Sequence, residues 1–154
     1  MNMKKEEMKK QIKKITERFF EKLGFPGDIT VDLKEENTFC ISVKTDEPQI
    51  LIGKKGETLF LIQRLLVKIL KKEISQDALI DLDINDYKKK KINFLRELAQ
   101  LAADEVALHK KEKELEPMPA YERRIIHLTL AERKDVTTES KGEEPKRRVV
   151  IKPT

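Results

Sequence analysis

The sequence has little of what disulfide-stapled or aromatic-rich proteins depend on. Its 154 residues include no tryptophan, one cysteine and only 5% aromatic residues, against 40% charged residues. The single cysteine, Cys40, excludes an intrachain disulfide, and its place in an alternating strand pattern predicts a thiol buried in the core. No apolar run exceeds the four residues Leu59–Ile62, which excludes a membrane-spanning helix. The core must therefore be aliphatic and the surface densely charged.

Signs of secretion and of catalysis are also missing. The start of the chain is charged with no apolar stretch behind it, so no signal peptide is expected and we predict a cytoplasmic protein. The two histidines, His109 and His127, have no cysteine or carboxylate at metal-ligand spacing, and no Walker-type loop or nucleophile signature occurs. We therefore expect no catalytic residue, no metal and no cofactor. The net charge of +5 and pI near 9.2 favour a polyanionic partner, although merely soluble proteins can share these values.

The first half of the chain alternates between helical and strand periodicity. Residues 3–23 carry apolar residues at helical spacing, with Leu23 at the end of the apolar face and Gly24 as the stop. Strands are predicted at 29–33, 39–43 and 78–82. Between the second and third we expect a short helix capped by Asp46 or Thr45, with Gln49 bonding back to Asp46.

The most informative stretch is Ile50–Leu59, an apolar turn followed by Gly53-Lys54-Lys55-Gly56 and then a helix to about residue 72. Glycines beside the lysines leave the backbone open to a polyanion, and the helix that begins there adds its free N–H groups and positive dipole end. Arg64 and Lys68 lie on the polar side of that helix. A bare G-x-x-G is more often a plain turn, but here an apolar triplet leads in and a long amphipathic helix leads out. The stretch resembles the nucleic-acid clamp of a KH domain.

The second half begins anew after Asp83. Asn85 is placed to cap a helix whose first turns hold four consecutive lysines, 88–91, most of them expected to be solvated. A short strand at 113–116, a helix at 120–132 and a hairpin of 136–140 with 146–151 follow.

In the helix at 120–132, Arg123 and His127 are four residues apart and so share a face. A guanidinium with an imidazole one turn later can contact phosphate, stack or donate a hydrogen bond. Arg124 and Lys134 are weaker candidates, and Lys134 is expected further along the same side of the helix. An isolated R-x-x-x-H is more often an inconsequential surface pair.

Three stretches favour a functional role for Arg123 and His127, because they occur together: Asp83–Tyr87, Pro119–His127 and Glu144–Pro153. They resemble the R-3-H domain, and a KH domain followed directly by an R-3-H domain resembles the Jag (SpoIIIJ-associated) family of bacterial RNA-binding proteins. The resemblance implies an α+β architecture: a type II KH domain at 1–83, then a small R-3-H domain at 84–154 with a three-stranded sheet and two helices. By position, Gly53, Lys54, Lys55 and Gly56 would be the KH clamp, and Arg123 and His127 the pair that names the second domain. Many family members carry an extra N-terminal domain, for which this chain has no room, and Asp86 stands where the family usually has glycine.

The expected function is non-catalytic binding of single-stranded RNA through two modules. The resemblance further implies an RNA chaperone or post-transcriptional regulator linked to cell shape and envelope homeostasis, and pairing with a small single-KH protein. Alternatives are a ribosomal-RNA assembly factor and a single-stranded DNA binder.

Overall fold

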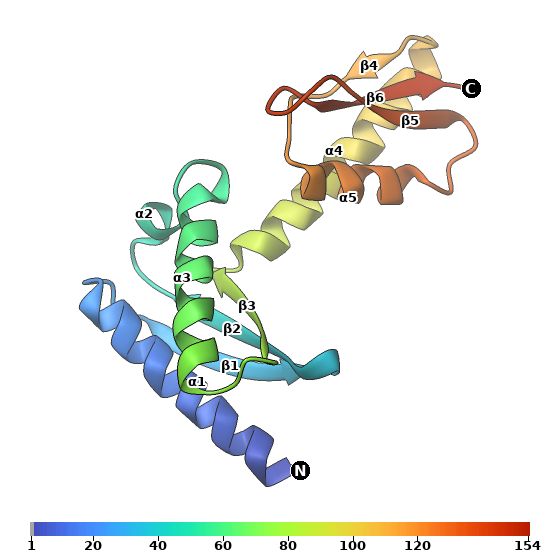
Figure 1. Cartoon of the computed structure of the whole chain (residues 1–154). Coiled ribbons are helices and arrows are strands. Elements are labelled where there is room, and N and C mark those ends of the chain that lie inside the picture. The colour runs from blue at the N-terminus through green and yellow to red at the C-terminus, as the bar shows by residue number, and fades with distance from the viewer. Residues whose placement is uncertain (1) are drawn as a thin grey trace. The chain divides into compact units, whose positions relative to one another are not determined.

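In the computed structural model, residues 2–154 are described, except for the side chains of Asn2, Met3 and Glu36. The chain forms two compact units, residues 1–88 and residues 89–154. The domain limits expected from the sequence, 1–83 and 84–154, stay a prediction beside these units. The colour ramp of Figure 1 follows the first unit from blue to green and the second from yellow to red.

The first unit is a three-stranded sheet with helices on one face (Figure 1). Its elements are α1 (Asn2–Lys22), β1 (Asp28–Lys34), η1 (Glu35–Asn37), β2 (Thr38–Lys44), α2 (Pro48–Ile52), η2 (Lys54–Gly56), α3 (Glu57–Glu73) and β3 (Leu79–Ile84). The strands lie in the order β1-β2-β3, with β2 antiparallel to β1 and parallel to β3. This is the arrangement expected of a type II KH domain.

The core of this unit is aliphatic, apart from two phenylalanines. Alternate strand residues point into it because successive side chains of a strand face opposite sides, so Phe39, Ile41 and Val43 are buried. The same alternation places Cys40 on the other face, where it is only partly buried. The expectation of a core thiol at Cys40 is therefore wrong, because the strand's register gives the core positions to its odd-numbered neighbours.

Helix α1 covers the sheet with Ile12, Thr16 and Phe20, which are fully buried. The Thr16 hydroxyl donates to the Ile12 carbonyl at 2.7 Å, which satisfies this polar group inside the core. Leu23 follows the end of the helix and is 42% exposed, so its expected place on the buried face is wrong. The buried stripe runs at four-residue spacing and leaves the sheet before Leu23.

The expected caps of the second and fourth helices are also wrong. Asn85 adopts a left-handed conformation (φ 48°) and bonds Thr45 twice: its Oδ1 accepts from the Thr45 N–H at 2.9 Å and its Nδ2 donates to the Thr45 carbonyl at 3.0 Å. The Asn85 side chain is therefore bound to the Thr45 backbone rather than to α4, and the Lys88 N–H donates instead to Asp83 Oδ1 at 3.0 Å. Helix α2 instead begins with Pro48 after Glu47, without a side-chain cap, since a proline at the first helical position has no N–H to satisfy.

The second unit is an antiparallel sheet with two helices. Its elements are α4 (Tyr87–His109, which begins at the end of the first unit), β4 (Lys113–Glu114), α5 (Ala120–Leu130), β5 (Val136–Lys141) and β6 (Arg148–Pro153). The strand order is β4-β6-β5. Its core joins α4 to α5 and the strands, and the alanines at 99, 102 and 103 are all buried in it. Small side chains there let the helix backbone approach its neighbours closely.

Candidate nucleic-acid interface

The conformation of the loop between α2 and α3 requires both of its glycines, because a Cβ at either position would overlap a neighbouring side chain. Gly53 has φ +71° and ψ −175°, and a Cβ there would lie 2.1 Å from the Thr58 Oγ1 and 2.8 Å from the Thr58 Cβ. Gly56 has φ +80°, and a Cβ there would lie 2.9 Å from Cε1 of the Tyr87 ring. The sequence suggested open access for a ligand; the structure adds that each glycine makes room for a side chain of its own unit. Thr58 and Tyr87 were not identified from the sequence as supports of this loop.

The lysines between the glycines are exposed to solvent. The side chains of Lys54 and Lys55 form no ion pair or hydrogen bond with the residues that the structure describes, and the Lys54 carbonyl accepts from the Glu57 N–H. Lys55 adopts a left-handed conformation (φ 54°), and Gly56 caps α3 without a side-chain hydrogen bond. Two unpaired ammonium groups therefore stand beside a helix start whose first N–H groups lack intrahelical partners, an arrangement suited to phosphate.

Helix α3 extends this charged surface and adds an aromatic ring. Arg64 and Lys68 are exposed, as predicted for the polar side of the helix. The Arg64 guanidinium lies 5.9 Å from the centroid of the Phe60 ring, which is itself 60% exposed. Exposed aromatic rings are stacking surfaces for unpaired bases. Phe60 lies outside the apolar repeat of α3 and was not identified from the sequence as a stacking ring.

In the second unit, Arg123 is largely occupied by its own fold. Its side chain is only 8% exposed, Nη1 donates to the Met118 carbonyl at 2.6 Å, and Nη2 pairs with Glu144 Oε1 at 2.7 Å. A phosphate would have to displace Glu144 to reach this guanidinium. A contact between Arg123 and nucleic acid stays a prediction, and the structure gives this residue a second role in holding the β5–β6 turn.

His127 lies one turn further along α5 and is half-buried against β5. Its Nδ1 is 2.7 Å from Thr138 Oγ1 and its Nε2 is 2.8 Å from Ser140 Oγ. Burial, and secondarily the positive charge of Arg123, lower the pKa of His127 below its usual value of 6.5, so the ring is neutral at pH 7. One ring nitrogen then donates to a hydroxyl and the other accepts from one. Both hydroxyl partners were missed, since nothing in the strand pattern pointed to them.

The weaker candidates of this unit have different positions. Arg124 is exposed on α5. Lys134 does not continue that helix, which ends at Leu130, two residues earlier than expected. The chain turns there through Arg133, whose guanidinium bonds Asp104 and Asp135 at 2.6 Å each. The predicted place of Lys134 along the helix is therefore wrong, although the residue is exposed in the turn that follows.

The four lysines at the start of α4 are partly used within the fold. Lys88 Nζ bonds Asp81 and Gln63 at 2.6 Å each, and Lys91 Nζ lies 3.8 Å from Glu122 and over the Phe94 ring. Lys89 and Lys90 are exposed. The second unit holds 16 basic and 12 acidic residues, a net charge of +4, whereas the first unit holds 17 and 16, a net charge of +1. Most of the chain's excess positive charge thus belongs to residues 89–154.

Comparison with known proteins places the chain in a family. Residues 93–153 match the family model of the R-3-H domain. The RNA-binding protein KhpB of Clostridium symbiosum is 37% identical over 148 residues, which are 96% of this chain and 67% of that protein. The chain belongs to the KhpB (Jag) family.

Two other KhpB proteins match over most of the chain. That of Bacillus subtilis is 33% identical, over 92% of this chain and 68% of its own length. That of Lactiplantibacillus plantarum is 34% identical, over 84% of this chain and 40% of its own length. The chain thus spans between two fifths and about two thirds of these relatives. None of the described helices has the length and apolarity needed to cross a bilayer.

Proposed function

We propose that the protein is a non-catalytic RNA-binding protein that holds single-stranded RNA with both units. The loop of the first unit carries the proposal, since two unpaired lysines stand at an open helix start. Relatives that match more than 90% of this chain bear the name RNA-binding protein, which supports RNA as the polyanion.

The proposed contacts follow from accessibility. In the first unit they are Gly53, Lys54, Lys55 and Gly56 to the sugar-phosphate backbone, then Arg64 and Lys68 along α3. In the second unit they are Arg124 and Lys134 on the surface, with His127 and Arg123 bordering the β5–β6 hairpin. Two weak sites on one chain raise the effective concentration of each for a strand that spans both, so the avidity exceeds either affinity.

Charge reversal in the loop tests this proposal. We expect Lys54→Asp with Lys55→Asp to weaken binding about tenfold or more and to leave the fold intact, because both side chains are exposed. Aspartate is chosen because it tolerates the left-handed conformation of Lys55 better than glutamate does. Fluorescence anisotropy with a single-stranded RNA across a range of salt concentrations measures the effect. The loss of two phosphate contacts should reduce the salt slope by about 1.4, since single strands give about 0.7 per contact.

A matched control separates the loop from net charge. Lys13 and Lys14 are adjacent, exposed lysines of α1. Lys13→Glu with Lys14→Glu changes the total charge by the same amount and should leave the affinity within about twofold of the wild-type value. Equal losses in the two variants, with native circular dichroism, would remove the loop from the proposal. A DNA strand of the same sequence and a co-sedimentation assay with ribosomal subunits decide between RNA, DNA and ribosomal targets.

The biological role that we propose is that of an RNA chaperone or post-transcriptional regulator in the cytoplasm, linked to cell shape and envelope homeostasis. Its ground is membership of the family, together with a site that offers binding groups. We also propose a small single-KH protein as a partner of the first unit, supported by the exposed Phe60, Leu61 and Leu65 of α3. Mixing the two proteins and measuring mass by light scattering tests the partnership; a mass that stays that of the separate chains refutes it.

A further inference from the structure

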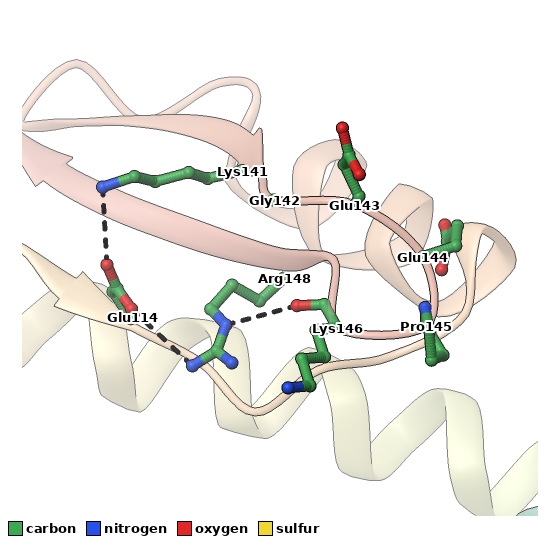
Figure 2. Close-up of a pocket in the computed structure, with 8 residues that line it drawn as sticks. All are labelled: Glu114, Lys141, Gly142, Glu143, Glu144, Pro145, Lys146 and Arg148. Atoms are coloured by element: carbon green, nitrogen blue, oxygen red, sulfur yellow. Dashed lines mark hydrogen bonds and ion pairs between the residues drawn. The ribbon is translucent and has the colours of Figure 1, made fainter.

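The β5–β6 turn of the second unit borders an open cavity of about 540 Å³, which Figure 2 shows. Its wall is the turn itself, residues 142–146, together with Glu114 of β4, Lys141 of β5 and Arg148 of β6. The volume lies within the range of about 300–1,000 Å³ that is typical of small-ligand sites. No motif pointed to this cavity from the sequence, because its charged residues come from three separate strands.

Hydrogen bonds within the β5–β6 turn, and an ion pair between the turn and α5, hold the shape of the turn. The Arg147 Nη1 donates to the Gly142 carbonyl at 2.8 Å, and the Lys146 N–H donates to the Glu143 carbonyl at 2.8 Å. The buried guanidinium of Arg123 holds Glu144 at 2.7 Å. The cavity is therefore preformed, and Arg123 is a positioning residue for it through Glu144.

Three carboxylates and three cations line the cavity, and two of the carboxylates are directed elsewhere. Glu144 is directed to Arg123, and Figure 2 shows Glu143 pointing away from Glu114 and Arg148. Glu114 then lies between two cations, with Oε1 3.7 Å from Lys141 Nζ and Oε2 3.6 Å from Arg148 Nη1. Lys146 forms no ion pair with any described residue.

Those two distances are longer than hydrogen bonds. No hydrogen bond from a described residue reaches the Glu114 carboxylate, so both of its oxygens keep free acceptor positions. A ligand that fits must offer paired N–H donors to Glu114 and acceptors or negative charge to Lys141, Lys146 and Arg148. A basic peptide meets only the first condition, because three cations repel it.

Among the nucleobases, guanine alone presents two adjacent N–H donors on its pairing edge, N1–H and the 2-amino group. Its O6 and N7 are acceptors of the kind that arginine and lysine bind. Adenine, cytosine and uracil each place an acceptor beside their donor on that edge. We propose that this cavity binds an unpaired guanine of the RNA strand, with Glu114 on N1–H and the 2-amino group, Arg148 or Lys141 on O6, and Lys146 on the adjoining phosphate.

This proposal rests on the proposed RNA binding, and its test separates the two. Two uridine-rich single strands of equal length are compared, one with a central guanosine and one with inosine, which lacks only the 2-amino group. Their charges are equal, so every backbone contact cancels. Fluorescence anisotropy with the full chain should give about tenfold tighter binding of the guanosine strand, the discrimination expected of one bidentate base contact. This comparison alters the RNA and therefore does not depend on any variant folding.

A variant then assigns the effect to Glu114. Glu114→Gln should abolish the preference for guanosine, so that the guanosine and inosine strands bind with equal affinity. The control Glu132→Gln removes the same charge from an exposed residue after α5, outside the cavity, and should keep the preference. Equal affinity of the wild-type protein for both strands overturns the guanine site while RNA binding stands. Binding of neither strand refutes the proposed function itself. Saturation of the cavity by free guanosine monophosphate without any preference between the strands also overturns the proposal, in favour of a free nucleotide.

Discussion

Gly24 and Gly53 both have a positive φ, but only Gly53 is crowded. At Gly24 (φ +82°) an added Cβ meets nothing within 4 Å, whereas at Gly53 (φ +71°) it would overlap Thr58. We expect Gly24→Ala to cost about 1–2 kcal/mol, the penalty of the left-handed region for an L-residue. Gly53→Ala carries a strain of about 1–3 kcal/mol for a conformation nearly restricted to glycine, and overpacking adds about 1–3 kcal/mol. The expected total is about 2–6 kcal/mol.

Rotation of the Thr58 side chain cannot remove this overlap. The Oγ1 could swing away, but the Thr58 Cβ would still lie at 2.8 Å and its backbone nitrogen at 3.1 Å, so the loop itself must move. The free energy of unfolding is measured by urea denaturation of the full chain, with hydrogen exchange of peptides from α3 to report the first unit. If Gly53→Ala destabilises α3 no more than Gly24→Ala destabilises the end of α1, the close approach of Thr58 has no energetic weight and the reasoning fails.

Three further predictions concern the second unit. The pKa of His127 in the folded protein lies below its unfolded value near 6.5, so the unfolded chain takes up the proton first as the pH falls. The stability of this unit should therefore fall as the pH drops below about 6.5. Urea denaturation at several pH values should show this dependence of stability on pH in the wild type and not in His127→Gln. Ile126→Ala should cost about 2–5 kcal/mol because the side chain is fully buried, whereas Leu128→Ala, at a 64% exposed position of the same helix, should stay within about 0.5 kcal/mol; equal thermal shifts would contradict the burial. Arg123→Met should cost about 1–3 kcal/mol of stability because it leaves the Met118 carbonyl without its donor. Hydrogen exchange should then increase at the Leu115 N–H, which donates to Val149, and at the Met118 N–H, which donates to Arg147. Unchanged exchange at these two amides would refute the anchoring role of Arg123.

Periodicity predicted most of the fold, because burial alternates with the geometry of each element. The sequence indicated the helices at α1, α3 and α5, and both hairpins, within a few residues of the observed bounds. It failed where a residue had two possible partners. Asn85 bonds the backbone of Thr45, forty positions away, and so gives up the cap that local spacing assigned to it. A contact of that separation leaves no trace in a local pattern.

The local sequence also could not predict which face of β2 the Cys40 side chain occupies. The alternation Phe39–Val43 fits a thiol on either side until the register is known, and the covering helices decide which side is core. Phe60 lies outside the apolar repeat of α3 and is exposed accordingly, but nothing in that repeat indicates a role for an exposed ring. Periodicity finds the apolar stripe, and packing partners then choose which of its members remain in solvent.

The motif at Arg123 and His127 shows how a correct spacing can leave a role undecided. Four residues along α5 place both side chains on one face, as expected, and that face is directed at the β5–β6 hairpin: Arg123 holds Glu144 in the turn, and His127 bonds two hydroxyls of β5. The Arg123 side chain is only 8% exposed and already bonds both the Met118 carbonyl and Glu144. It is therefore a poor first contact for a solvated phosphate, because these partners already compensate the desolvation of its charge. The exposed cations that remain are on the hairpin and its surroundings. If Arg123 and His127 act on nucleic acid by shaping that hairpin, Arg123→Met should weaken binding of a guanosine strand to the level of an inosine strand and leave the inosine affinity almost unchanged; a direct phosphate contact would instead weaken both strands equally.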